Sequence, residues 1–243
     1  MVCTGLRLQG RERAGDLYAA LAWLRAQPWV NPACFAAAGW SHGGWAIMDA
    51  LASGPDAARF SRIEGLGPDP LAGLAGAFLV YPWAGVGSLT GRRGWTRPVR
   101  ALMILGGRDS VSGTYLPRRA ADRARANGAD IEVVVFPDAT HAFDEAHGAD
   151  PRVRFSSARF AEAKALFAQF LGAQHGNRFH DHKAARQGQI GNAVGLAPGD
   201  QRIAIGVLAV GQQYDLLALL GVRHRERTVL VVRPDGGRVG LHH

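Results

Sequence analysis

Three short stretches of the sequence carry residue types that together can perform acyl-transfer chemistry. Ser41 lies within a G-W-S-H-G pattern, Asp109 ends a G-G-R-D stretch, and His141 opens an H-A-F-D stretch. A serine hydroxyl is a weak nucleophile until a base removes its proton, and histidine can do so because its unperturbed pKa is about 6.5. A carboxylate bonded to the other imidazole nitrogen fixes the tautomer and stabilises the imidazolium. We therefore predict Ser41 as nucleophile, His141 as base and Asp109 as acid.

The stretch around Ser41 has the pattern of a sharp turn between a strand and a helix. A short apolar run at residues 35–38 predicts a buried strand before the turn. After the turn, small and apolar residues recur at helical spacing: Gly44, Ile47, Met48 and Leu51. Glycines flank Ser41 because side chains in such a tight, strained turn would clash with the strand and the helix. The geometry exposes the hydroxyl of Ser41 and puts the His42 backbone N–H at a helix N-terminus, where we predict that it donates to a developing oxyanion.

Other residues could fill the acid and base roles: Asp138, Asp144, His42 and His147. Asp109 is favoured as the acid because it stands just after a predicted strand. His42 belongs to the turn itself, where we expect its side chain to point away from Ser41, and His147 lies in a looser segment. His141 follows the last predicted strand and is therefore favoured as the base.

Strand patterns alternate with helix patterns through the first 172 residues. The predicted strands cover residues 35–39, 75–81, 99–105 and 131–136, and the main helices residues 13–27, 116–127 and 153–171 besides the one after Ser41. Residues 53–70 and 84–98 are rich in glycine and proline or arginine and are expected to be loops. The alternation predicts the α/β class, with a parallel sheet covered by helices on both faces. In such sheets, reactive groups gather in the loops at the carboxyl ends of the strands.

Composition narrows the class of protein. The 243 residues are 47% hydrophobic, and the first residues have no signal-peptide pattern. No uninterrupted apolar run of about 18 residues predicts a membrane span. Two cysteines, Cys3 and Cys34, make neither a disulfide framework nor a metal site, so we expect a cytoplasmic protein with reduced thiols. The net charge of +8 is spread among acidic residues, which favours a solvated surface over binding to nucleic acid or a membrane.

The character of the chain changes after residue 172. We divide it into residues 1–172, which we expect to be the C-terminal portion of an α/β domain, and residues 173–243, a basic tail rich in glycine and histidine that we expect to be poorly ordered. His180-Asp181-His182 lacks a third cluster of ligands, so we predict no metal site. Two apolar runs in the tail, residues 203–210 and 228–232, could be strands.

Taken together, the three stretches around Ser41, Asp109 and His141 resemble the motif blocks of the dienelactone hydrolase family of α/β-hydrolases. The resemblance covers about residues 13–172, and the H-A-F block is its most family-specific part. It implies a partial α/β-hydrolase fold, with the same three residues as nucleophile, acid and base. It also implies hydrolysis of carboxylic esters or lactones through an acyl-enzyme, without a cofactor. The founding members carry cysteine at the position of Ser41, whereas many esterase-like relatives carry serine.

The family fold places further strands ahead of the first predicted helix, where this sequence has few residues. We therefore expect a truncated or degenerate hydrolase whose chain alone has little or no esterase activity, with the second oxyanion donor missing. The strand at residues 35–39 would have one open edge, which favours self-association, unless the apolar runs of the tail cover it. The alternative functions are a non-catalytic interaction module and a nucleic-acid-associated protein acting through the tail.

Overall fold

The computed structural model describes residues 9–28, 30, 32–146, 150–176, 206–210 and 229–232. The elements follow one another in the order α1 (Gly10–Arg25), β1 (Phe35–Trp40), α2 (His42–Ser53), η2 (Gly54–Asp56), α3 (Ala57–Ser61), β2 (Leu74–Val80), β3 (Arg100–Gly106), α4 (Tyr115–Ala126), β4 (Asp130–Phe136), α5 (Ser157–Gly176), β5 (Gly206–Val210) and β6 (Val229–Val232). Each of the strands and main helices predicted up to residue 172 is present, with boundaries shifted by a few residues. The region expected to be a loop at residues 53–70 is partly helical, because η2 and α3 continue the chain after α2.

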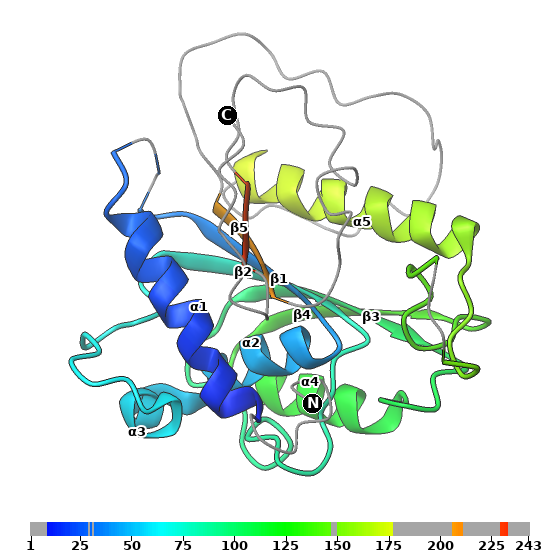
Figure 1. Cartoon of the computed structure of the whole chain (residues 1–243), viewed down its shortest axis with the longest axis horizontal. Coiled ribbons are helices and arrows are strands. Elements are labelled where there is room, and N and C mark those ends of the chain that lie inside the picture. The colour runs from blue at the N-terminus through cyan, green and yellow to red at the C-terminus, as the bar shows by residue number, and fades with distance from the viewer. Residues whose placement is uncertain are drawn as a thin grey trace, which may run out of the picture.

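One sheet holds all the described strands, in the order β4-β3-β2-β1-β5-β6, and each neighbouring pair is parallel. Helices α1, α2 and α4 lie on one face of the sheet, and α5 lies on the other (Figure 1). This arrangement confirms the predicted α/β class with a parallel sheet covered on both faces.

Each face of the sheet buries its own apolar core. On the first face, alternate residues of the strands pack against the leucines of α1 and most of α2. On the other face, Phe167 and Phe170 of α5 stack against Phe78 of β2, with ring centroids 4.7 and 5.9 Å apart. Strand β1 is buried throughout because it lies inside the sheet and under both layers. Aromatic residues therefore fix α5 over the centre of the sheet.

Helix α1 begins where the sequence supplies a cap. The backbone N–H of Gln9 donates to the carboxylate of Glu12 at 2.9 Å, which satisfies a donor that the first turn leaves without an intrahelical acceptor. Leu17, Leu21 and Leu24 recur at helical spacing and form an apolar stripe along α1 that is fully buried. These contacts hold α1 alongside α2 on the first face of the sheet.

Strand β1 has no open edge, because the apolar runs of the tail cover it, which is the alternative that the sequence left open. Residues 35–39 pair in parallel with residues 206–210 of β5, and β6 pairs with the far side of β5. The apolar runs of the tail thus supply the backbone donors and acceptors that the edge of β1 requires. Two segments beyond residue 172 therefore belong to the same sheet as the first four strands. Among the described strands, β4 and β6 form the edges of the sheet.

Candidate active site

Ser41 occupies the corner between β1 and α2. Its backbone has φ 47° and ψ −113°, a conformation that is costly for any residue other than glycine and that must be held by its surroundings. The Ser41 N–H donates to the Val80 carbonyl at 2.9 Å, and the Ser41 carbonyl accepts from Trp45 at 3.0 Å. The end of β2 and the first turn of α2 therefore fix the strained corner.

Two glycines allow this corner to close. A Cβ atom on Gly39 would lie 2.6 Å from the carbonyl carbon of Gly43, and one on Gly44 would lie 2.7 Å from Cβ of Pro82. Contacts this short require the backbone to move. The prediction that side chains would clash at the turn is thus confirmed at Gly39 and Gly44.

His141 lies in the loop after β4 and reaches across to the corner. Its Nε2 atom is 2.9 Å from Oγ of Ser41, and the residue is 8% exposed. The backbone of His141 forms an isolated parallel bridge with Val153, which ties the two ends of this loop together. The imidazole is consequently held at the carboxyl end of the sheet, beside the serine.

Asp109 lies in the turn after β3, and its side chain is fully buried. Its Oδ2 atom lies 2.8 Å from Nδ1 of His141. Its Oδ1 atom accepts from the backbone N–H groups of Val111 and Ser112, at 2.7 and 2.9 Å. A carboxylate can stay charged when buried only if such donors replace its water. With Nδ1–H donating to Asp109, the Nε2 lone pair of His141 is left to accept the Ser41 hydroxyl proton.

The competing carboxylates bond elsewhere. Asp138 pairs with Arg159 on the surface, and this hydrogen bond lowers the pKa of Asp138. Asp144 accepts from Nε1 of Trp40 at 2.8 Å and from the hydroxyl of Tyr81 at 2.6 Å. Asp109 is therefore the acid that geometry places on the imidazole.

Of the competing histidines, the His42 ring packs on Trp45, with centroids 4.9 Å apart. His147 lies outside the described residues, as does His180-Asp181-His182. Within the part of the chain that the structure describes, no group of three or more His, Cys, Asp or Glu residues could hold a metal ion. In that same part, no helix has the length and apolarity needed to cross a membrane.

Sequence reasoning missed two buried polar groups near the site. Tyr81 directly follows β2, is 1% exposed and packs on the imidazole of His141, with ring centroids 4.6 Å apart. Asp49 is fully buried in α2, and burial raises its pKa to about 7, against the effect of hydrogen bonds from the loop after β2 and from Trp45. The only signal for Asp49 was a single acid in an otherwise apolar helical stretch. No local signal marked Tyr81.

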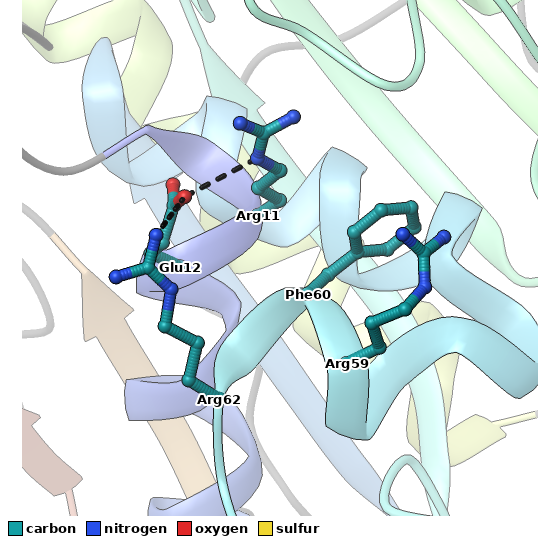
Figure 2. Close-up of a pocket in the computed structure, with 5 residues that line it drawn as sticks. All are labelled: Arg11, Glu12, Arg59, Phe60 and Arg62. Carbon is teal, nitrogen blue, oxygen red and sulfur yellow. Dashed lines mark hydrogen bonds and ion pairs between the residues drawn. The ribbon is translucent and has the colours of Figure 1, made fainter.

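A hollow of about 230 Å³ lies on the surface between α1 and α3. Figure 2 shows the side chains that line it, which are Arg11, Glu12, Arg59, Phe60 and Arg62. The Glu12 carboxylate bonds Arg11 at 3.2 Å and lies 3.8 Å from Arg62, and Arg59 lies over the Phe60 ring. None of the three predicted catalytic residues lines this hollow, so it is separate from the Ser41 corner.

The described chain has part of the α/β-hydrolase fold. A parallel sheet with helices on both faces carries a serine at a strand-to-helix corner, and a carboxylate and a histidine follow later strands. That combination of sheet, corner and chain order is typical of the α/β-hydrolase fold.

No protein-family model and no curated protein sequence matches the chain. Solved structures do match it. One similar structure is a dienelactone hydrolase-like promiscuous phosphotriesterase from metagenomic libraries, with a TM-score of 0.52 and 20% identity over 70% of this chain and 64% of that one. Another is a carboxylesterase from Lactobacillus plantarum, with a TM-score of 0.52 and 13% identity over 68% of this chain and 69% of that one. The chain thus spans less than two thirds of the phosphotriesterase. The likeness confirms the predicted resemblance at the level of the fold.

Proposed function

We propose that the chain is a serine hydrolase that cleaves carboxylic esters or lactones through an acyl-enzyme. One observation carries this proposal: an unbroken line of hydrogen bonds from Asp109 through His141 to Ser41, with distances of 2.8 and 2.9 Å. Three loops far apart in sequence contribute to it. A buried carboxylate, an imidazole and a strained serine in this order have the geometry that nucleophilic acyl transfer requires.

In the first half of the reaction, Oγ of Ser41 attacks the carbonyl carbon while its proton passes to Nε2 of His141. The bond to the leaving alkoxide then breaks, and the alkoxide takes that proton. In the second half, Nε2 removes a proton from water, the hydroxide displaces Oγ, and Ser41 recovers its proton from His141. For a lactone, the leaving oxygen stays attached to the same molecule, so the product is a hydroxy acid. Asp109 stays ionised throughout and stabilises the imidazolium.

Negative charge develops on the carbonyl oxygen during each attack. The His42 backbone N–H belongs to the first turn of α2, directly after Ser41, where the helix dipole also favours an anion. We assign it as one oxyanion donor. Loss of a single oxyanion donor costs about 10² to 10³ in turnover.

A fluorophosphonate probe separates the chemistry from turnover, because it traps an activated serine without requiring deacylation. We expect the wild-type chain to be labelled at Ser41, and Ser41→Ala to abolish labelling. Ser61→Ala is the matched control because Ser61 caps the end of α3 through the Ala57 carbonyl, away from the catalytic loops. Hydrolysis of p-nitrophenyl acetate and a simple lactone would then measure turnover. A folded wild-type protein that is not labelled would overturn the proposal in favour of a non-catalytic module.

A further inference from the structure

A pair made of a buried tyrosine and a half-buried carboxylate, Tyr81 and Asp144, lies beside the histidine of the proposed triad. The ring of Tyr81 packs on the imidazole of His141, and its hydroxyl donates to Oδ1 of Asp144 at 2.6 Å. The other carboxylate oxygen of Asp144 accepts from Trp40, the residue before Ser41. The Asp144 carboxylate therefore links Tyr81, whose ring packs on the imidazole, to Trp40, which precedes the proposed nucleophile.

Tyr81 also contacts the turn that holds the acid. Its carbonyl accepts from the hydroxyl of Ser112 at 3.2 Å, and the backbone N–H of Ser112 donates to Asp109. Tyr81 thus touches the acid loop through its carbonyl, the base through its ring and Asp144 through its hydroxyl.

The backbone is strained at Tyr81 and next to His141, and the surrounding contacts must hold it in that conformation. Tyr81 has φ 38°, and Ala142, next to His141, has φ 48°. Positive φ is costly in a bulky residue and persists only where the surrounding contacts hold the backbone in place. The hydrogen bond from the Tyr81 N–H to the Ile104 carbonyl, at 2.7 Å, secures the other side of the residue. Such strain is typical of functional sites.

We propose that Tyr81 and Asp144 form a positioning pair that keeps the imidazole of His141 in line with Ser41, an inference that rests on the proposed hydrolase function. Neither residue removes a proton from substrate. The pair acts by limiting rotation of the imidazole through ring packing, and the carboxylate holds the tyrosine ring in place. A misplacement of about 1 Å in a catalytic group can cost on the order of 10²-fold in rate.

Three substitutions separate the parts of this pair. Tyr81→Phe keeps the ring but removes the hydrogen bond to Asp144. Asp144→Asn keeps the shape of the side chain and removes its negative charge. The amide oxygen can still accept from Trp40, and the NH₂ group can donate to the Tyr81 oxygen, so both contacts can remain. Asp144→Ala removes both contacts. Tyr18→Phe is the matched control, because it deletes another buried tyrosine hydroxyl, bonded to the Ala50 carbonyl at 3.3 Å.

The test measures the limiting rate and the affinity of fluorophosphonate labelling separately, together with thermal unfolding. We expect Tyr81→Phe to lower the limiting rate by about 10-fold and Asp144→Ala by up to about 10²-fold, with probe affinity unchanged. Asp144→Asn should fall between wild type and Asp144→Ala, and Tyr18→Phe should label like wild type. A purely structural role would lower the unfolding temperature without this split between rate and affinity. If folded Tyr81→Phe and Asp144→Ala proteins are labelled at the wild-type limiting rate, the proposed positioning role of Tyr81 and Asp144 is overturned.

A second readout does not depend on reactivity. The Cε1–H resonance of His141, assigned by its absence in His141→Gln, should move in Tyr81→Phe and Asp144→Ala but not in Tyr18→Phe. If the wild-type protein is not labelled, the hydrolase proposal fails and this resonance alone decides the pair: movement supports it, and an unchanged resonance overturns it.

Discussion

The backbone N–H of Leu89 donates to Oδ1 of Asp49 at 2.8 Å and so ties the loop after β2 to the centre of α2. The same oxygen accepts from the Thr90 N–H at 3.1 Å and the Ser88 hydroxyl at 3.2 Å, while Oδ2 accepts from Nε1 of Trp45 at 2.7 Å. All four partners are donors. The helix that begins at Ser41 is thereby joined to the loop that follows Tyr81.

Replacing Asp49 with asparagine should destabilise the protein. An amide that keeps its oxygen toward Leu89 must turn its NH₂ group toward the Trp45 N–H, so two buried donors oppose each other. A buried unsatisfied donor costs about 1–3 kcal/mol of unfolding free energy. Urea denaturation would measure this, and the cost should shrink in a Trp45→Phe background. An equal cost in both backgrounds would contradict the assigned geometry.

The pH dependence of stability should differ between the wild type and Asp49→Asn. Burial raises the pKa of Asp49 from its usual 3.8 to about 7, so the folded state holds a proton there that the unfolded state has lost. This contribution to stability is full below about pH 4 and is lost as pH rises through about 7. The free energy of unfolding of the wild type relative to Asp49→Asn should therefore fall between about pH 4 and about pH 7 and stay level above that. Parallel pH profiles of unfolding free energy for the wild type and Asp49→Asn would contradict the raised pKa of Asp49.

The acid assignment predicts a large loss on changing Asp109. Asp109→Asn should slow acylation of Ser41 by about 10⁴-fold, because the amide favours the wrong imidazole tautomer. The rate of fluorophosphonate labelling measures this step. Asp138→Asn is the control: its carboxylate pairs with Arg159 on the surface, and labelling should stay at the wild-type rate. A larger loss in Asp144→Asn than in Asp109→Asn would reverse the assignment.

The two glycines of the corner should not tolerate alanine. Gly44→Ala places Cβ 2.7 Å from Cβ of Pro82, and we expect it to lower the free energy of unfolding by about 1–3 kcal/mol and to weaken labelling of Ser41. Gly172→Ala, in α5, meets no heavy atom within 4 Å and should instead be neutral or stabilising, by up to about 1 kcal/mol. Chemical denaturation of both variants is the measurement. Equal stability of the two would show that the corner can relax.

Removing the chain after α5 should expose the edge of β1. A protein ending at residue 176 lacks both β5 and β6, so residues 35–39 keep β2 on one side but lose their parallel partner on the other. We expect a lower unfolding temperature and concentration-dependent association, measured by light scattering. Deletion of residues 233–243 keeps both strands and should leave the protein monodisperse. A stable monomer ending at residue 176 would show that the pairing of β5 contributes little.

The first four strands and their helices could be predicted because their signals are local. Apolar runs such as residues 131–136 and the leucine stripe of α1 depend only on the spacing of neighbouring residues. The convergence of Ser41, Asp109 and His141 was predictable from one rule of parallel sheets, that loops after the strands meet at one edge.

The rest depends on contacts between distant residues. The apolar run at residues 203–210 looks like many others, and nothing near it identifies β1 as its partner. The sequence favours Asp109 over Asp144 only by its position just after a predicted strand, because only the folded structure shows which carboxylate meets the imidazole. The contact between Tyr81 and His141 likewise joins residues on different loops.

The parallel pairing of β1 with β5 has a consequence for how the protein is made. Residues 35–39 leave the ribosome long before residues 206–210. One edge of β1, the strand that leads into Ser41, therefore stays unpaired while most of the chain is synthesised. Closing so long a loop is slow, and it delays the last hydrogen bonds of the sheet. During that interval an apolar segment can pair with another nascent chain, so the yield of native protein should depend on chaperones and on the rate of translation.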